Sequence, residues 1–259
     1  MDSTLFHKMA DVLHAAAGKK TAKYATAALI VAAGSSTRMG DAGSKQLQLI
    51  CGKPLIVHTL LAFENAQNIS DIIVAAKEEE IPLYAEFAEK YHITKFRQAV
   101  PGGKTRQESV EHAFRSLPDK TRYVAVADGA RCLVTPGDID LVCSEAYVWG
   151  AATAACPAVD TIKVANASGF IESTPDRSTL WTAQTPQVFR EDLFRTALYF
   201  AKESHFTGTD DNSLVENIKG HIKLVKTDGS NIKITYPSDL LFAEAVLSSR
   251  QPAPPSSPT

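Results

Sequence analysis

Residues 27–40, AALIVAAGSSTRMG, decide the fold of this chain, and SKQ at residues 44–46 completes the pattern. The apolar run that opens the stretch predicts a buried strand, and the small residues from Gly34 onward predict a loop whose N–H groups can approach an anion closely. In an α/β protein such a strand ends at a ligand crevice. Arg38 and Lys45 add positive charge to this loop. The stretch therefore predicts a site for a nucleoside triphosphate; the alternative is an ordinary turn that carries two solvated cations.

Two better-known phosphate-binding motifs do not fit the sequence. A dinucleotide fingerprint needs glycine at the first, third and sixth loop positions, which are Gly34, Ser36 and Met39 in this chain. Residues 103–105, GKT, resemble the end of a P-loop, but Gln98 stands where that motif requires its first glycine. The sequence therefore argues against both a dinucleotide-binding domain and a Walker-type NTPase.

Composition limits the classes of protein to which the chain can belong. Its 259 residues suffice for one large α/β domain or two modest ones. The 27 basic and 29 acidic residues give a formal charge of -2, which argues against general nucleic-acid binding. No apolar run is long enough to cross a membrane, and the four cysteines show neither a CxxC pair nor a metal-binding spacing. We expect a cytoplasmic protein with free thiols and neither a membrane nor a nucleic-acid partner.

Apolar strands and amphipathic helices alternate along the chain, which predicts an α/β fold with a mostly parallel sheet and helices on both faces. Helices are expected at residues 55–64, 81–91, 104–116, 136–149, 190–202, 210–217 and 237–247. Strands are expected at residues 71–76, 123–127, 151–159, 221–226 and 231–235. Residues 160–182 break this rhythm and predict a β-hairpin arm that leaves the main sheet.

The two ends of the chain are expected to lie outside the domain, which we place at residues 25–249. Residues 1–24 carry apolar side chains at helical spacing but no secretory apolar core, so they predict a short amphipathic helix that packs on the domain, or a frayed extension. Residues 250–259 are rich in proline and serine and cannot bury apolar surface. They are predicted to be disordered.

Further polar clusters stand where strands are expected to end or helices to begin. Gly103 precedes a predicted helix that carries Arg106 and Ser109 in its first turns, and such an N-terminus can bind an anion or a base edge. A simple turn is the alternative. Asp128 directly follows a buried strand, a position from which carboxylates hold Mg²⁺ against phosphates. Its alternatives are a helix cap or an ion pair with Arg131.

The ordered set of motifs is more specific than any single one. AAGxSxRMG with SKQ, PGGxxRQxSV, DGAR, DTIK, TPQ, TDD and NIKIT follow one another along the chain. This set closely resembles the 2-C-methyl-D-erythritol 4-phosphate cytidylyltransferases of the isoprenoid pathway, from about residue 27 to about residue 246. Ribitol-5-phosphate cytidylyltransferases share most of these motifs. The resemblance implies a Rossmann-like nucleotidyltransferase domain that uses CTP and Mg²⁺ and releases pyrophosphate.

The resemblance implies a role for each matching residue on the nucleotide side. The residues that would contact CTP are Ala32, Ala33, Gly34, Ser35, Ser36, Gly103, Arg106 and Ser109. Arg38 and Lys45 would neutralise the β- and γ-phosphates and the charge that develops at the α-phosphate. Asp128 would hold Mg²⁺, and Lys233 would support the region of the α-phosphate and the metal.

Four further residues are implied for the acceptor, a polyol phosphate. Arg131, Thr161, Arg177 and Thr209 would grip its phosphate and hydroxyl groups. The resemblance also implies a homodimer in which the β-arm crosses the two-fold axis, so that Thr161 and Arg177 would serve the site of the partner subunit. Thr209 or Asp210 would equally suit the N-cap of the helix that follows, and that role does not exclude ligand binding.

The reaction that the resemblance implies is mainly electrostatic. A phosphate oxygen of the acceptor attacks the α-phosphorus of CTP in line, and pyrophosphate leaves. Because the nucleophile is already an anion, fixed cations are needed more than a strong base. Methylerythritol 4-phosphate is the expected acceptor. The alternatives are ribitol 5-phosphate, another base or acceptor, and a catalytically weak homologue that binds nucleotide, although the retained cations argue against the last.

The sequence departs from the family pattern at a few positions. Ser44 stands where the family usually has proline before the loop lysine, and Ala127 and Cys132 stand where it usually has histidine and proline. Asp128 and Arg131 are kept between them, so the assigned site is retained. We expect Cys132 to be a small buried residue, the alternative being a reactive thiol beside Arg131.

Overall fold

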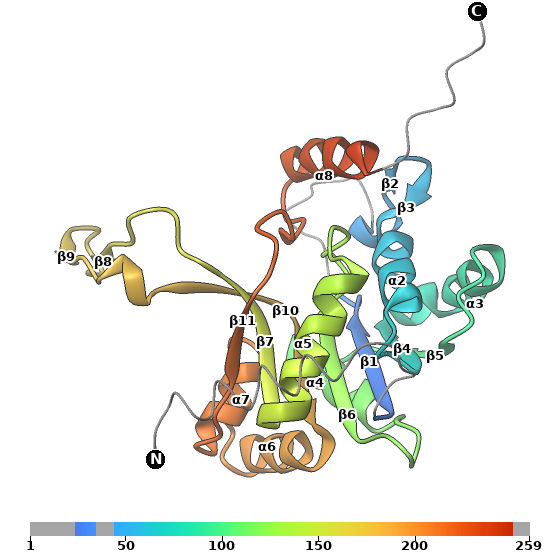
Figure 1. Cartoon of the computed structure of the whole chain (residues 1–259), viewed down its shortest axis with the longest axis horizontal. Helices are drawn as coiled ribbons and strands as arrows, with labels where there is room; N and C mark the ends of the chain where they lie inside the picture. The colour runs from blue at the N-terminus through green and yellow to red at the C-terminus, as the bar shows by residue number, and fades with distance from the viewer. Residues whose placement is uncertain (1–23, 35–43, 251–259) are drawn as a thin grey trace, which may run out of the picture.

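A seven-stranded sheet forms the centre of the computed structural model, which describes residues 24–34 and 44–250 (Figure 1). Its strands are β1 (Thr26–Val31), β4 (Asp71–Ala76), β5 (Phe96–Pro101), β6 (Tyr123–Asp128), β7 (Ala151–Pro157), β10 (Trp181–Arg190) and β11 (Lys223–Lys226). Their order in the sheet is β11-β7-β10-β6-β1-β4-β5. Within this sheet β10 runs antiparallel to its neighbours β6 and β7, and the other ladders are parallel. The predicted α/β class with a mostly parallel sheet is confirmed.

Helices cover both faces of this sheet. They are α2 (Leu55–Asn65), α3 (Ile81–Lys90), α4 (Arg106–Phe114), α5 (Pro136–Trp149), α6 (Glu191–Glu203) and α7 (Asp211–Asn217). Neighbouring side chains of a strand point to opposite faces, so each face of β1 joins a separate core. Ala28 and Ile30 pack with Ile56 of α2, whereas Leu29 packs with Val110 of α4 on the other face. β1 is thus buried on both sides, as its apolar sequence predicts.

A last helix, α8 (Pro237–Ser249), packs beside the region where the strands end. It covers a small hairpin, β2 (Leu49–Ile50) and β3 (Lys53–Pro54), which follows the short helix η2 (Lys45–Leu47). A further short helix, η3 (Glu78–Glu80), precedes α3. Ile50, Ile234 and Ala243 form part of the small apolar core beneath α8. This core fixes η2 and residues 231–235 close to one another.

Between β7 and β10 the chain leaves the sheet as an arm that projects from the body of the molecule (Figure 1). The arm contains the hairpin β8 (Val164–Ala165) and β9 (Ile171–Ser173), followed by the short helix η4 (Arg177–Thr179). Nearly all of its side chains are exposed. This is the β-hairpin expected at residues 160–182.

Three segments differ from the sequence-based expectation. The pattern predicts neither β5, an edge strand, nor β10, which contains Pro186 after a cis peptide bond. Proline argues against a central strand, and this one is accommodated where the pairing of β10 with β7 shifts register. The strand predicted at residues 231–235 is wrong. That segment is irregular and is held by contacts such as the hydrogen bond from Ile234 N–H to the Ala130 carbonyl, 2.9 Å.

Some predictions fall outside the described residues. The extension expected at residues 1–24 and the tail expected at 250–259 lie there almost entirely, and so do Ser35, Ser36 and Arg38. Across residues 24–34 and 44–250, no helix is long and apolar enough to span a membrane.

Candidate functional site

The candidate site lies where β1, β4 and β6 end, at the carboxyl edge of the parallel strands. The last residue of β6, Asp128, is in register with Val31 of β1, and the next residue, Gly129, donates its N–H to the Val31 carbonyl at 2.8 Å. The turn after β5 also lies against the segment that follows β1, because a Cβ added at Gly102 would lie only 2.2 Å from the Cβ of Ala33. The start of the predicted triphosphate loop, the glycine turn and the acid are therefore brought together.

Asp128 is at the centre of a network of ion pairs. Its Oδ1 accepts a hydrogen bond from Arg106 Nε at 2.9 Å, and its Oδ2 lies 2.7 Å from Lys233 Nζ. Arg106 also donates through Nη2 to the buried carboxylate of Asp211 at 2.7 Å. Neither alternative for Asp128 is found among the described residues: its ion pairs are with Arg106 and Lys233 and not with Arg131, and α5, the helix that follows it, is capped by Thr135.

The network sets the charge state of its members. Burial alone raises the pKa of Asp128, but Arg106 and Lys233 outweigh burial and hold that pKa well below its ordinary value. Burial also lowers the pKa of Arg106, and the two carboxylates more than reverse this. For Asp211, burial dominates and raises the pKa against the opposing effect of Arg106. Asp128 is therefore a carboxylate under all ordinary conditions.

Lys45 and Lys233 meet at the segment of residues 231–235, to which Lys233 belongs and to which Lys45 is hydrogen-bonded. Lys45 Nζ donates to the Ile234 carbonyl at 2.7 Å. The segment is fixed in turn by the fully buried Asn231, whose amide donates to Gln184 Oε1 at 3.1 Å and to the Thr185 carbonyl at 3.0 Å. Two predicted catalytic lysines, far apart in sequence, are thus held close to one another.

Arg131 donates to the same segment, and no ion pair joins it to Asp128 among the described residues. Its Nη1 donates to the Asn231 carbonyl at 2.6 Å, and burial lowers the pKa of its guanidinium. The next residue, Cys132, is buried in the core under α8, and burial raises the pKa of its thiol to about 12. The structure supports the expectation that Cys132 is a small buried residue, because a buried thiol with a raised pKa is not a reactive thiolate.

The glycine turn is held by the helix that follows it. Gly103 N–H donates to Ser109 Oγ at 3.0 Å, and Ser109 Oγ donates to the Thr105 carbonyl at 2.9 Å. Thr105 caps α4 through a capping box with Glu108, which is why the helix begins two residues later than predicted. Gly103 and Ser109 therefore lie together, as the resemblance implies.

The remaining predicted acceptor residues lie farther out. Thr161 and Arg177 are exposed on the arm, which projects away from the Asp128 network of the same chain (Figure 1). Arg177 Nη1 donates to the Val159 carbonyl at 2.8 Å. Thr209 is exposed just before Asp210, which caps α7. Of Thr161, Arg177 and Thr209, only Thr209 is close in sequence to the Asp128 network, since it precedes Asp211 by two residues.

Several residues at the site were not predicted. Asp211 pairs with Arg106, and its backbone N–H donates to Gln187 Oε1 at 3.0 Å. Thr185 Oγ1 accepts a hydrogen bond from Asp128 N–H at 3.1 Å. These residues lie within the quoted TDD and TPQ motifs, so the motifs were the available signal, but the partners of each side chain depend on the fold.

The acidic side chains at the site determine whether it could hold Mg²⁺. Within the described parts of the chain, no group of three or more His, Cys, Asp or Glu residues could hold a metal ion. Mg²⁺ in phosphoryl-transfer enzymes is usually held by one or two carboxylates and by substrate phosphates, not by an all-protein cage. The carboxylate of Asp128, close to the start of the predicted triphosphate loop, fits this pattern.

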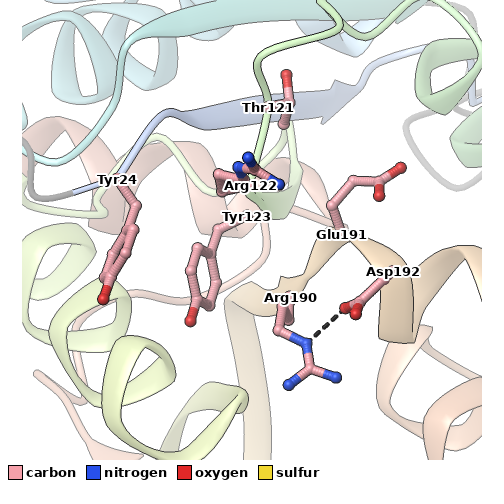
Figure 2. A pocket seen from close by; sticks show the side chains of 7 residues that line it. All are labelled: Tyr24, Thr121, Arg122, Tyr123, Arg190, Glu191 and Asp192. Carbon is pink, nitrogen blue, oxygen red and sulfur yellow. Dashed lines mark hydrogen bonds and ion pairs between the residues drawn. The ribbon is translucent and has the colours of Figure 1, made fainter.

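A cavity of about 270 Å³ lies at the opposite end of β6 (Figure 2). Tyr24, Tyr123 and the backbone turn into α6 line it, with Arg190 paired to Asp192 at 2.5 Å. Ligands of open α/β sheets bind at the carboxyl ends of the strands. This cavity is therefore separate from the candidate site.

Comparison with known proteins gives one consistent result. The family model described as IspD, 2-C-methyl-D-erythritol 4-phosphate cytidylyltransferase, matches residues 26–249. A relative of that name from Pelotomaculum thermopropionicum is 41% identical over 226 residues, which cover 87% of this chain and 95% of the relative. One from Caldanaerobacter subterraneus is 43% identical over 221 residues, covering 85% and 97%.

Solved structures agree with the sequence comparison. The 4-diphosphocytidyl-2C-methyl-D-erythritol synthase of Anaerococcus prevotii superimposes with a TM-score of 0.77 at 27% identity, covering 87% of this chain and 99% of that one. The 2-C-methyl-D-erythritol 4-phosphate cytidylyltransferase of Thermus thermophilus gives a TM-score of 0.72 at 28% identity, covering 86% and 99%.

Proposed function

The chain belongs to the 2-C-methyl-D-erythritol 4-phosphate cytidylyltransferase family, and we propose that it transfers CMP from CTP to 2-C-methyl-D-erythritol 4-phosphate with release of pyrophosphate. The observation that carries the proposal is the network at the carboxyl ends of the strands, where Asp128 pairs with Arg106 and Lys233 beside Lys45. The curated relatives quoted above are named for this acceptor and not for ribitol 5-phosphate.

On the nucleotide side, the backbone that begins at Ala32 and Gly34 would receive the triphosphate, together with Ser35, Ser36 and Arg38 of the loop. Gly103 and Ser109 would meet the cytosine and ribose. Asp128 would hold Mg²⁺, which when bound neutralises phosphate charge.

The main obstacle to the reaction is the repulsion between two polyanions, CTP and the acceptor phosphate. Lys45 and Lys233 are fixed by contacts to the Ile234 carbonyl and to Asp128, so their charges need little reorganisation when the transition state forms. Preorganised charges of this kind stabilise a transition state more than mobile ones do. We assign Lys45, Lys233 and Arg38 to this stabilisation.

On the acceptor side, Arg131 and Thr209 would belong to the same chain, whereas Thr161 and Arg177 would come from the arm of a partner subunit. The arm carries exposed apolar side chains that a second copy would cover. They are Val159, Ile162, Val164, Phe170, Ile171 and Trp181. A homodimer through the arm follows from this proposal. Its place would be the cytoplasm, where free thiols such as Cys132 and Cys143 stay reduced.

The test is pyrophosphate release from CTP with methylerythritol 4-phosphate and ribitol 5-phosphate side by side, and then from ATP, GTP and UTP with the better acceptor. We expect a kcat/KM at least about 100-fold higher for CTP with methylerythritol 4-phosphate, because a site built for particular hydroxyl groups rejects analogues that leave them unpaired. Equal rates with both acceptors, or turnover of neither, would contradict the proposal.

The shared site is tested by mixing two inactive variants, Arg38→Ala and Arg177→Ala. If the arm serves the partner, some mixed dimers contain one intact site and activity returns. Verified mixed dimers without activity would show that each site belongs to one chain.

A further inference from the structure

Asp211 is a buried carboxylate to which the proposed reaction gives no role. It is the first residue of α7, and its side chain is 1% exposed. A charge removed from water is costly unless it is paired. Asp211 Oδ2 accepts a hydrogen bond from Arg106 Nη2 at 2.7 Å, while its Oδ1 is buried with no hydrogen-bond partner among the described residues. The carboxylate is thus kept in the interior for its contact with Arg106.

Capping of α7 does not account for this placement. Asp210 is the cap, and its Oδ1 accepts the hydrogen bond from Ser213 N–H at 3.0 Å. A carboxylate in the first turn also interacts with the helix dipole, but it does so from an exposed position without the cost of burial. The role of Asp211 therefore lies on the side of Arg106.

Arg106 joins two carboxylates from different parts of the chain. Its Nε donates to Asp128 Oδ1 at 2.9 Å and its Nη2 donates to Asp211. Because a guanidinium is a rigid planar fork, fixing one branch fixes the direction of the other. Lys233 Nζ meets the remaining oxygen of Asp128. The position of the Asp128 carboxylate thus depends on Asp211 through Arg106.

Asp211 also sets the charge balance around Asp128. Two cations, Arg106 and Lys233, face the side chains of Asp128 and Asp211, so the charges of the four groups balance when both acids are ionised. Without the charge of Asp211 the network carries excess positive charge, and Arg106 is drawn to Asp128 alone. An incoming cation would then compete with a guanidinium that has no other partner.

We propose that Asp211 is a positioning residue for cytidylyl transfer, which holds Nη2 of Arg106 while Nε meets Asp128, and so keeps the Asp128 carboxylate in place and available to a divalent cation. This inference rests on the proposed role of Asp128 toward Mg²⁺. Asp211 itself touches neither substrate nor metal.

The test measures Mn²⁺ binding in the presence of CTP and without acceptor, by electron paramagnetic resonance, so that no turnover is needed. Asp211→Asn keeps the size of the side chain and removes its charge. We expect the Mn²⁺ dissociation constant to rise about 10- to 100-fold, with a matching rise in the Mg²⁺ concentration for half-maximal turnover. Glu216→Gln, at an exposed position of the same helix, removes an equal charge and is expected to change neither value by more than about twofold.

The dependence on Arg106 is tested by a double-mutant cycle. If Asp211 acts through Arg106, adding Asp211→Asn to Arg106→Gln changes Mn²⁺ affinity by less than about twofold. An equal effect in both backgrounds would overturn the proposal. Should Asp211→Asn fail to fold, Arg106→Lys takes its place, because an ammonium cannot bridge the two carboxylates as the planar fork does; wild-type Mn²⁺ affinity in that variant would overturn the proposal.

Asp128→Asn separates this inference from the function on which it rests. If Asp128→Asn weakens Mn²⁺ binding and Asp211→Asn does not, only the role of Asp211 is wrong. If Asp128→Asn leaves Mn²⁺ binding unchanged, the metal assignment of Asp128 is wrong and the role of Asp211 is overturned with it.

Discussion

Lys45 Nζ lies 2.7 Å from the carbonyl oxygen of Ile234, so the end of the loop that begins at Gly34 is joined to the segment that carries Lys233. Ile234 N–H in turn donates to the carbonyl of Ala130, two residues beyond the strand end that carries Asp128. Three segments far apart in sequence are therefore held at fixed distances. This arrangement suits a site that must bear high negative charge without rearranging.

Replacing Lys45 is expected to reduce turnover much more than CTP binding. Lys45→Ala removes one fixed charge from the region where the transition state develops its charge, which costs about 100-fold or more in kcat. The KM for CTP is expected to change by only a few-fold, because other groups still hold the triphosphate. Steady-state kinetics with varied CTP measures both values.

The control for this prediction is Lys202→Ala, which removes an exposed lysine from α6. We expect its kinetics to match the wild type. A Lys45→Ala enzyme with normal kcat and only a raised KM would assign the lysine to ground-state binding.

Replacing Gly102 is expected to damage nucleotide binding by sterics. The added Cβ of Gly102→Ala would lie 2.2 Å from the Cβ of Ala33, so the glycine turn must move away from the start of the triphosphate loop. Such overpacking costs about 1–3 kcal/mol of stability. We expect a lower melting temperature together with a KM for CTP raised about tenfold.

Gly137→Ala is the matched control, since the nearest atom to its added Cβ, Thr135 Oγ1, is 3.9 Å away. It is expected to leave the KM for CTP unchanged and not to lower the melting temperature, because alanine suits this helical position better than glycine does. Wild-type melting and CTP kinetics in Gly102→Ala would mean that the two segments separate freely, contrary to the tight contact in the structure.

The sequence predicted most of the fold because local patterns determined it. β1, β4 and β6 are buried on both faces, and the helices expected between them leave enough chain for parallel crossovers, so their order implied a parallel sheet. β10 was missed because Pro186 contradicts a central strand, although a shift in register accommodates it. Residues 231–235 alternate like a strand, but they form no ladder: Ile234 N–H bonds to the carbonyl of Ala130 in the loop after β6, and Asn231 bonds to Thr185 of β10 through its side-chain amide.

The candidate site was predicted by motif order more than by local chemistry. Asp128 alone suited a cap equally well, and its pairing with Arg106 and Lys233 depends on elements that meet only in the folded chain. Arg106 was expected to contact CTP, and its two carboxylate partners could not be seen in the sequence. Asp211 is the last residue of the quoted TDD motif, but no role was predicted for it. Its burial, which marks it as unusual, depends on the folded chain and cannot be seen in the motif.

The exposed apolar side chains of the arm predict that the protein is a dimer. Phe170 is 72% exposed near its tip and would be buried by a second copy, so Phe170→Glu is expected to shift the protein toward monomers. Turnover should fall with it, since Arg177 would no longer reach the partner's site. Sedimentation velocity and pyrophosphate release on the same samples measure both effects.

Phe200→Glu provides the comparison for the arm variant, because Phe200 is 51% exposed on α6, away from the arm. It should leave the sedimentation coefficient unchanged. If Phe170→Glu behaves identically to Phe200→Glu, the apolar arm is not the dimer contact.

A last prediction concerns the pH dependence of stability at the other end of the sheet, where β4 begins. Asp71 is the first residue of β4 and is 1% exposed. It accepts hydrogen bonds from Arg97 Nε at 2.5 Å and from Ser70 Oγ at 2.6 Å. Burial raises the pKa of Asp71, but Ser70 and Arg97 outweigh it, so the folded pKa is below its ordinary value. A carboxyl group of this kind stabilises the fold above its unfolded pKa of about 4, and the contribution is lost as the pH falls through the folded value.

Asp71→Asn should therefore lower the free energy of unfolding by about 1–3 kcal/mol near neutral pH, toward the low end because Arg97 is 55% exposed and solvent screens the pair. The difference from wild type should begin to narrow as the pH falls below about 4, because the Asp71 carboxyl group is then protonated in the unfolded chain while the folded protein still holds it ionised. Urea unfolding at about pH 7 and about pH 3 measures the two differences.

Asp192→Asn serves as the control, because Asp192 pairs with Arg190 at the surface with 66% of its side chain exposed. Solvent screens this pair, so its removal should change the free energy of unfolding very little. A difference for Asp71→Asn that stayed constant down to about pH 3 would mean that the carboxylate contributes by packing and not by its charge.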